Sequence, residues 1–354
     1  MSAIVSDHNY IDRERVEKAA FMLKTLCLES PVAFSPTASN GLLGPLPLVD
    51  SLANSPIQRI PISNRNSSVV AIDGGSSVLA KGGNIEVIAW RAGMVHFHGT
   101  KRISEECTSP QILTYNRLQS QEILKECAAA GQLAFNENAE PLRLVDELRW
   151  LDEWQLLEQA VDCSDPGTLI LMDGSLRGNP GFDLGLQMRL LRTAHEKDIF
   201  VIALSKQTSL SLGQMGLIDA VYGSVQDSNV SFRQINHPLD DNSGWLGNIF
   251  LARLHPAADK MYRIDINRFD PTPPEEIFSS LTAVCDDVES PGYPYPLIAA
   301  HRLARIDGNF RQELVAAIGT ALEKAAFPTP LWEYLAGDVH DKLNADLMTM
   351  VKAG

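Results

Sequence analysis

The sequence VVAIDGG at residues 69–75 is the stretch that decides the fold. Its run of Val, Ala and Ile is typical of a buried strand, and the Asp-Gly-Gly that follows predicts a tight turn after Asp73. The same pattern recurs in TLILMDGSL at 168–176, where an apolar run again ends in Asp-Gly. Two strands that end alike predict an open sheet with two carboxylates, Asp73 and Asp173, at one edge.

Strand-like and helical segments alternate around these two stretches. Residues 85–99 continue the β pattern and predict an antiparallel meander after the first strand. Further strands are expected at 199–206, 250–256 and 261–266, and helices at 13–29, 111–130, 143–161, 183–197, 296–306 and 311–325. This order predicts an α/β fold, a ribonuclease H-like mixed sheet with flanking helices.

The composition of the chain changes near residue 66. Residues 1–66 combine the first expected helix with a segment rich in Pro, Ser, Asn and Gly, which predicts an irregular N-terminal arm. Residues 67–354, including the C-terminal helices expected within 311–354, are then the main domain. We therefore expect a helical and irregular arm followed by one large α/β domain.

Composition also excludes several classes of protein. Apolar residues make up 45% of the chain and charged residues 21%, which excludes a mainly disordered protein. No apolar run reaches the roughly 18–20 residues that cross a bilayer, and the first residues are too charged for a signal peptide. The five cysteines lack CxxC spacing and predict neither a disulfide framework nor a zinc site. We expect a cytoplasmic protein in a reducing compartment, with no membrane partner.

The formal net charge of −14 opposes a nucleic-acid partner at first sight, because phosphate contacts need cations. The acids are unevenly distributed, however. Residues 140–165 carry eight acids against two arginines, and in the whole chain 19 Arg outnumber 11 Lys. Arginine is the better bidentate partner for phosphate. This distribution predicts a solvated acidic surface together with a carboxylate metal site, and weak DNA binding by the protein alone.

Asp73 and Asp173 are the first candidates for that metal site. Carboxylates on neighbouring strands can share divalent cations, and the glycine after each one permits a close approach of backbone or substrate. Asp-Gly after a strand is equally typical of an ordinary turn, so either position alone has this simpler interpretation.

A third carboxylate is expected from the helix at 143–161. Glu147 and Glu153 both have apolar neighbours one helical turn away, where a charge is costly unless it is paired or bound to metal. The alternative is that both are charges at the rim of the core that pair with Arg143 or Arg149.

The segment SPGYPYPLIAAHRLARID at 290–307 is the most distinctive of the chain. Its prolines predict an extended approach to a helix that carries His301, Arg302 and Arg305. A histidine on such a helix is most often part of the core, but the tyrosines and arginines favour a site that faces a phosphate-rich ligand. Lys206 follows a strand and is expected at the same edge of the sheet as the two aspartates.

The chain resembles the NurA family of DNA-repair nucleases over about residues 69–310. Five blocks carry the resemblance in the order of the family: AIDGGSS (71–77), LILMDGSL (169–176), ALSK (203–206), RLHP followed by YRIDI, and GYPYPLIAAHRLARI (292–306). The last block is the specific one. The resemblance implies a ribonuclease H-like nuclease fold, Mn²⁺-dependent DNA cleavage with Mg²⁺ as the other candidate ion, a homodimer, and a hexameric HerA ATPase as partner.

The resemblance also assigns roles to residues. It implies that Asp73, Asp173, Tyr293 and His301 are catalytic, and the spacing to Asp173 favours Glu153 over Glu147 as the family's helical glutamate. The metal ligands would be Asp73, Glu153, Asp173 and His301. Apart from the resemblance, the cations Lys206, Arg302 and Arg305 are the candidate phosphate contacts with DNA.

The expected function is metal-dependent hydrolysis of DNA phosphodiesters during end resection at double-strand breaks, together with a HerA-type ATPase. Two alternatives remain at this point. The chain can be an inactive adaptor that binds DNA ends and docks on a motor ATPase, or a ribonuclease H-like enzyme that acts on RNA or hybrids.

Overall fold

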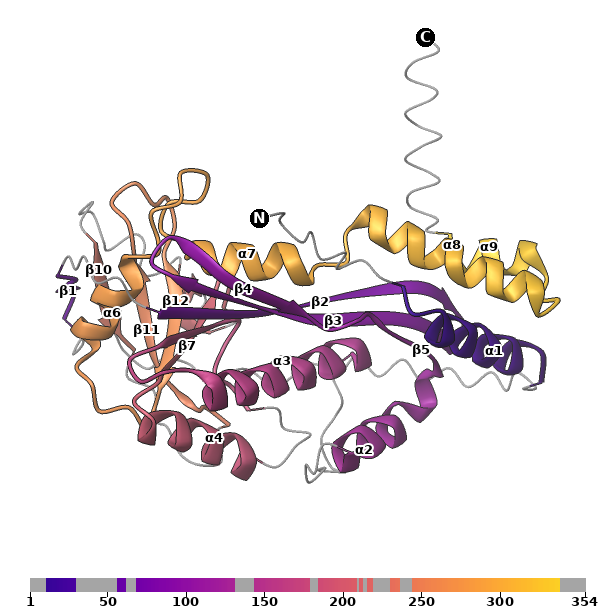
Figure 1. The fold of residues 1–354 in the computed structure, drawn as a ribbon, viewed down its shortest axis with the longest axis horizontal. Helices are drawn as coiled ribbons and strands as arrows, with labels where there is room; N and C mark the ends of the chain where they lie inside the picture. Colours follow the sequence, from indigo (N-terminus) through magenta and orange to yellow (C-terminus); the bar gives the residue numbers. More distant parts are fainter. Residues whose placement is uncertain are drawn as a thin grey trace, which may run out of the picture.

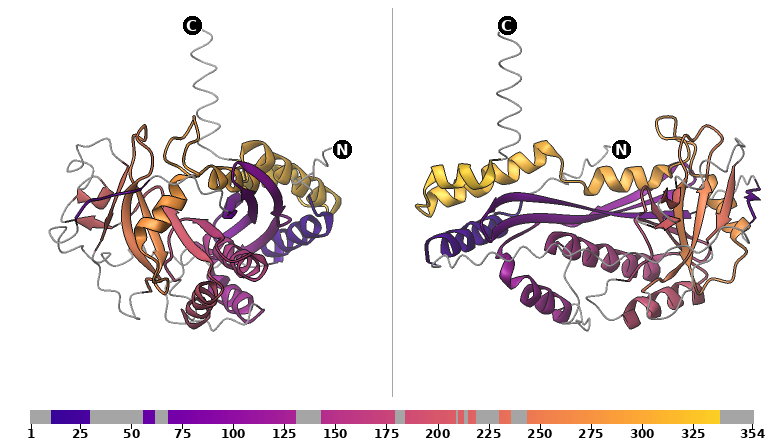
Figure 2. Two further views of the ribbon diagram at one scale, coloured as in Figure 1. Left: turned by 60° about the vertical axis from the view of Figure 1, so that its left-hand side comes forward. Right: turned by 180° about the vertical axis from the view of Figure 1, so that it is seen from behind.

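The protein is an elongated molecule in its computed structural model (Figure 1). Two long strands, β2 (Ser68–Gly82) and β3 (Ile85–His98), run along its longest axis. Most other strands gather at one end of this pair, and three helices pack at the other end (Figures 1 and 2). The structure describes residues 11–29, 56–61, 68–130, 143–178, 184–208, 210–212, 215–218, 230–235 and 244–337.

One mixed sheet organises the described residues. Its remaining strands are β1 (Gln58–Arg59), β4 (Lys101–Cys107), β5 (Gln111–Asn116), β6 (Leu169–Asp173), β7 (Phe200–Ser205), β10 (Ser231–Gln234), β11 (Gly247–Arg253) and β12 (Tyr262–Asn267). The order is β1-β10-β11-β12-β7-β6-β2-β3-β4, and β5 pairs with β3. β2, β3 and β4 form the antiparallel meander, to which β6 and β7 add in parallel. This topology confirms the ribonuclease H-like sheet. A separate hairpin joins β8 (Ser211–Leu212) and β9 (Met215–Gly216).

Helices cover both faces of the sheet at its wide end. One face carries α3 (Leu144–Cys163) and α4 (Leu184–Glu196), and the other carries α6 (Pro274–Thr282) and α7 (Tyr295–Ala304). The run LILM of β6 fits this arrangement, because alternate side chains enter the two cores and none meets water. A continuously apolar strand is therefore the sequence signature of this three-layer packing.

The other end of the β2–β3 pair is covered by α1 (Arg13–Glu29), α8 (Gly308–Lys324) and α9 (Thr329–Ala336). Their apolar faces form one cluster with the strands, in which Leu23 and Leu314 are almost fully buried. A short 3-10 turn (Arg117–Gln119) leads from β5 into α2 (Ser120–Ala130), which packs beside α3. We call the part formed by α1, α8, α9 and the adjoining strands the outer lobe.

The sequence interpretation of residues 69–75 is wrong in one respect. No turn follows Asp73, because β2 continues through Gly74 and Gly75 to Gly82 and stays paired with β3. What ends near Asp73 is the parallel pairing with β6, whose last partners are Ile72 and Met172. Two glycines in a strand are therefore a feature of close packing here rather than of a turn.

The helix expected at 111–130 is also only partly correct. Residues Gln111–Asn116 form β5 and pair with Ile85–Trp90, and only the later part is helical. The segment QILTYN pairs with a strand that lies more than 20 residues earlier in the chain, so tertiary pairing rather than local pattern decides its structure. The helices expected at 13–29, 143–161 and 183–197 are confirmed within a few residues.

The N-terminal arm lies mostly outside the described residues. A described part of it, β1, pairs with β10 at the edge of the sheet, and α1 packs in the outer lobe. The division of the chain at residue 66 stays a prediction. Among the described residues no helix has the length and apolar character needed to span a membrane.

Candidate nuclease centre

The site begins with the register of the two parallel strands. Ile72 of β2 lies opposite Met172 of β6, so Asp73 and Asp173 take the next position on each strand. Parallel strands expose corresponding ends at the same edge of a sheet, and ligand sites form at this edge in open sheets. Asp73 is almost fully buried, whereas the side chain of Asp173 keeps 21% exposure.

His301 reaches the same edge from α7. Pro294 is extended and precedes the first helical residue, Tyr295, as the prolines of the sequence predict. His301 Nδ1 lies 2.7 Å from Asp73 Oδ2, and the other oxygen of Asp73 accepts the amide of Gly74 at 2.7 Å. With a carboxylate as its partner Nδ1 is the donor, so that in the neutral imidazole the lone pair is on Nε2.

The three side chains form a compact group. One ligand atom from each of Asp73, Asp173 and His301 lies within 4.8 Å of the others. Two carboxylates and one imidazole are donors that Mn²⁺ accepts, and the carboxylates also suit Mg²⁺. The site thus has the donor set of a divalent cation site.

Tyr293 and Lys206 both contact Asp173. The buried hydroxyl of Tyr293 donates to Oδ1 at 3.2 Å, and Lys206 Nζ lies 3.0 Å from Oδ2 and 4.9 Å from the centre of the Tyr293 ring. Burial, together with the charges of Asp173 and Asp73, raises the pKa of Tyr293 above its usual range. Tyr293 is therefore a protonated hydrogen-bond donor at this site.

Glu153 of α3 completes the acidic edge. It is fully buried, and burial together with the charges of Asp73 and Asp173 raises the pKa of Glu153 to about 8, although Arg149 and a hydrogen bond from Gly74 oppose the shift. Arg149 Nη1 lies 3.2 Å from Glu153 Oε1, yet this oxygen has no well-aligned hydrogen-bond donor. A buried carboxylate oxygen that lacks such a donor fits a ligand that supplies positive charge.

Glu147 is buried as well but lies six positions earlier on α3. At about 100° per residue the two glutamates differ in direction by about 240°. Glu153 interacts electrostatically with both Asp73 and Asp173. The structure thus places Glu153 beside the two aspartates, whereas Glu147 points in a different direction from α3.

The two glycines of AIDGG let helices approach β2 from both faces. A Cβ on Gly74 would overlap Glu153 Oε1 and Arg149 Cγ of α3. A Cβ on Gly75 would overlap the carbonyl of Ala304 at the end of α7. Because successive strand residues face opposite sides, each glycine makes room for one of the helices that bring Glu153 and His301 to the site.

The model of the NurA domain family matches residues 67–306, the part of the chain that contains this whole site. The chain belongs to the NurA family. No curated protein matches closely enough to count as a relative. Among solved structures, the NurA nuclease from Sulfolobus solfataricus is 19% identical with a TM-score of 0.51, and the match covers 78% of this chain and 90% of that one. The catalytic domain of human endonuclease V is 14% identical with a TM-score of 0.39, over 71% of this chain and 85% of that one.

This NurA family member has a supporting ion pair that the sequence interpretation missed. Arg263 and Asp265 of β12 are buried and joined by two short hydrogen bonds, and Asp265 Oδ2 accepts the Leu176 amide at 3.0 Å. Leu176 follows Asp173 in the chain, so the pair holds the loop that carries this aspartate. The sequence could have indicated this ion pair, because Arg263 and Asp265 are charged residues inside the otherwise apolar run MYRIDI.

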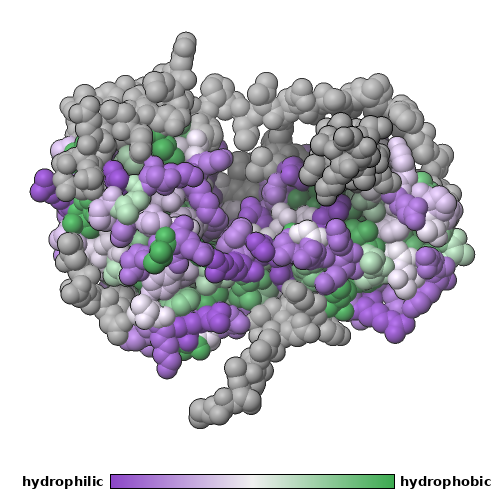
Figure 3. Space-filling model, turned by 90° about the horizontal axis from the view of Figure 1, so that it is seen from above, coloured by the Kyte–Doolittle hydropathy of each residue, from purple (hydrophilic) through white to green (hydrophobic). Residues whose placement is uncertain are grey.

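Arg302 and Arg305 are exposed at the C-terminal end of α7, outside the group formed by Asp73, Asp173 and His301. Arg302 contacts Glu289 at 3.4 Å, and Arg305 contacts Asp307 at 3.1 Å. Seen from above, hydrophilic residues extend across the middle of the described face that carries α7 and α8 (Figure 3). Lys206 thus contacts a carboxylate of the site, at the edge of the sheet where the sequence analysis expects it. Arg302 and Arg305 lie at the C-terminal end of α7, and their ion pairs are with Glu289 and Asp307 rather than with the acids of the site.

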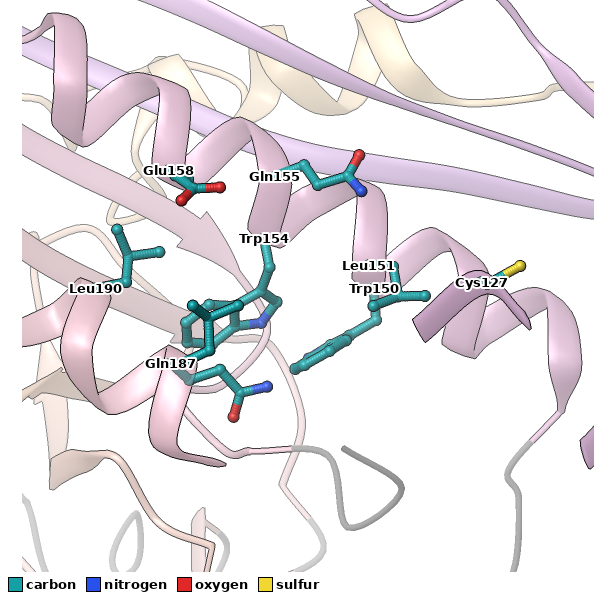
Figure 4. Close-up of a pocket in the computed structure, with 9 residues that line it drawn as sticks. Cys127, Trp150, Leu151, Trp154, Gln155, Glu158, Gln187 and Leu190 are labelled. Carbon is teal, nitrogen blue, oxygen red and sulfur yellow. The ribbon is translucent and has the colours of Figure 1, made fainter. Parts of the chain in front are cut away.

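A separate pocket of about 60 Å³ lies between α2, α3 and α4 of this NurA chain (Figure 4). Trp150, Trp154 and Gln187 line it, and none of the candidate catalytic residues does. Gln187 is 3% exposed, and among the described residues neither its amide nitrogen nor its oxygen has a hydrogen-bond partner. The pocket is thus distinct from the acidic edge.

Proposed function

We propose that this NurA family member is a metal-dependent deoxyribonuclease that hydrolyses phosphodiester bonds during DNA end processing. The observation that carries the proposal is the group of Asp73, Asp173 and His301, whose ligand atoms lie within 4.8 Å of one another. A cytoplasmic homodimer that works with a hexameric HerA-type ATPase belongs to the same proposal and rests on the family resemblance.

The proposed metal ligands are Asp73, Asp173, Glu153 and His301. The donor chemistry fits Mn²⁺, with Mg²⁺ as the second candidate, and the unsatisfied Glu153 Oε1 fits a nearby positive charge. A bound divalent ion supplies Lewis acidity, which lowers the pKa of water and neutralises charge on a phosphate.

The protein's own groups then orient the substrate and move protons. Asp73 fixes the imidazole of His301 through Nδ1, so that Nε2 can bind the ion or accept a proton. Tyr293 keeps its proton and holds Asp173 in position through a hydrogen bond. If Asp173 held the ion, the hydroxyl of Tyr293 would be free to donate to a phosphate oxygen.

Phosphate contacts are proposed for Lys206, Arg302 and Arg305. Lys206 lies at the carboxylates themselves, and the arginines are exposed on the helix that carries His301. Cations of this kind position a nucleic-acid backbone without reading its sequence.

End-labelled DNA incubated with Mn²⁺, Mg²⁺ or EDTA tests the proposal. The wild-type protein is expected to cleave with metal and to be inactive in EDTA, and Asp173→Asn should lose at least about 100-fold in rate because a charged ligand is lost. Asp162→Asn is the matched control, since Asp162 is a surface acid that pairs with Lys197 away from the site.

Parallel substrates and the partner ATPase separate the alternatives. Preferential cleavage of RNA or of RNA–DNA hybrids would show that the substrate is RNA or a hybrid rather than DNA. DNA binding without cleavage, in every metal and with the HerA-type ATPase added, would contradict nuclease activity and leave the adaptor. Full activity of Asp173→Asn in Mn²⁺ would contradict the metal-ligand assignment.

A further inference from the structure

Both carboxylate oxygens of Asp173 are already occupied by groups of the protein. Oδ1 accepts the hydroxyl of Tyr293 at 3.2 Å, and Oδ2 lies 3.0 Å from the ammonium of Lys206. A cation that binds Asp173 must therefore share or replace these partners. The tyrosine is neutral and compatible with a neighbouring cation, whereas the lysine carries the same sign of charge as the ion.

Lys206 is able to leave this position. Its side chain is 45% exposed, it follows the last residue of β7, and its aliphatic stem carries several rotatable bonds. Arg149, the other cation of the site, differs in this respect. It pairs with Glu153, and its side chain is packed where a Cβ on Gly74 would be. Arg149 is thus the fixed counter-ion and Lys206 the movable one.

We propose that Lys206 is a displaceable counter-ion of Asp173, which gives way to a divalent ion and then binds a backbone phosphate of the nucleic acid. This inference rests on the proposed metal-dependent nuclease and adds the order of events at its site. In the free protein Lys206 neutralises Asp173 and competes with the ion. In the complex it neutralises a phosphate instead.

The exchange couples the two ligands. An ammonium beside a divalent ion is repelled by it, and a phosphate that arrives next to both cations removes this repulsion. Metal ions therefore strengthen phosphate binding, and by linkage the nucleic acid strengthens metal binding by the same factor. The Tyr293 ring, 4.9 Å from the ammonium, keeps Lys206 near the site during the exchange.

Binding of Mn²⁺, measured by electron paramagnetic resonance of the free ion, tests the coupling without any readout of activity. The titration uses the full chain with and without a phosphorothioate oligonucleotide that resists hydrolysis, and Mn²⁺ bound to the oligonucleotide alone is subtracted. The wild type is expected to bind Mn²⁺ about tenfold more tightly when the oligonucleotide is present. Lys206→Met should bind Mn²⁺ more tightly than the wild type without DNA, and the oligonucleotide should then raise its affinity by a clearly smaller factor than in the wild type, because only the direct attraction between ion and phosphate remains.

Two further variants make the result specific. Lys197→Met removes an equally charged side chain from a surface pair with Asp162 and should behave as the wild type. Lys206→Arg keeps a cation for both partners and should retain the coupling. The inference is overturned if Lys206→Met keeps the wild-type coupling, or if its Mn²⁺ affinity in free form is unchanged. Absence of Mn²⁺ binding by the wild type would instead overturn the proposed metal-dependent function, and this inference with it.

Discussion

Glu153 shows how the fold holds a group in an unfavourable environment at the place where chemistry is expected. The carboxylate is buried next to Asp73 and Asp173, and the nearby cation Arg149 opposes the rise of its pKa without cancelling it. Desolvation of this kind favours the protonated form until a cation arrives. Without metal, Glu153 is therefore a source of instability whose size depends on pH.

Replacement of Glu153 by Gln should make this pH dependence visible. The carboxyl has a pKa near its usual 4.5 when unfolded and about 8 when folded, so the unfolded chain binds fewer protons between these values. The free energy of unfolding of the wild type therefore falls as the pH rises through this window, relative to Glu153→Gln, by on the order of 5 kcal/mol. Urea unfolding in EDTA at several pH values measures the difference. Parallel curves for the two proteins would contradict the assignment.

Gln187 gives a second prediction for a single residue. Its buried amide has no hydrogen-bond partner in the part of the chain that the structure describes. Gln187→Met keeps the shape and removes the polar atoms, so it should raise the free energy of unfolding by about 1–2 kcal/mol. Gln155→Met, at an exposed position of the same pocket, should change it by less than about 0.5 kcal/mol. A destabilised Gln187→Met would indicate that another group satisfies the amide.

At the scale of elements, the close contacts of β2 with α3 and α7 position the site. Gly75→Ala should lower the free energy of unfolding by about 1–3 kcal/mol, because the new Cβ overlaps a backbone carbonyl that cannot rotate away. Gly308→Ala, at the start of α8 with no atom within 4 Å of its Cβ, should be neutral or slightly stabilising. Equal effects of the two substitutions in thermal or urea unfolding would contradict this account.

The sequence predicted the elements whose pattern is local. Helical periodicity was sufficient for α1, α3 and α4, and the apolar run before Asp173 was sufficient for β6. The continuation of β2 beyond Asp73 and the strand β5 could not be predicted in this way, because distant partner residues determine both. The same distinction holds for the site. The aspartates were recognisable because each follows an apolar run, although only Asp173 ends its strand, whereas the choice of Glu153 over Glu147 depends on how α3 is rotated against β2.

At the scale of the whole molecule, the net charge of −14 bears on the proposed binding of DNA. Without metal, the carboxylates repel phosphate and Lys206 is engaged with Asp173. DNA binding by the protein alone should then be weak, in the range of about 10⁻⁴ to 10⁻⁶ M at physiological salt, and should weaken further as salt increases. Fluorescence anisotropy with labelled DNA, across salt concentrations and with or without Mn²⁺, measures this. Tight binding that resists salt in EDTA would contradict it.

The length of β2 has a mechanical consequence for the molecule. One long strand carries Asp73 in its first half and is packed in the outer lobe through its second half, whereas Asp173 belongs to β6, which contributes no residue to the apolar cluster of the outer lobe. Arg91 of β3 also binds the carbonyls of Ala304 and Arg305 at the end of α7, the helix of His301. A strand resists stretching but bends, so a load applied to the outer lobe would reach Asp73 and His301 before it reached Asp173. The spacing of the acidic edge is thereby sensitive to force on a part of the protein that contains none of its ligands.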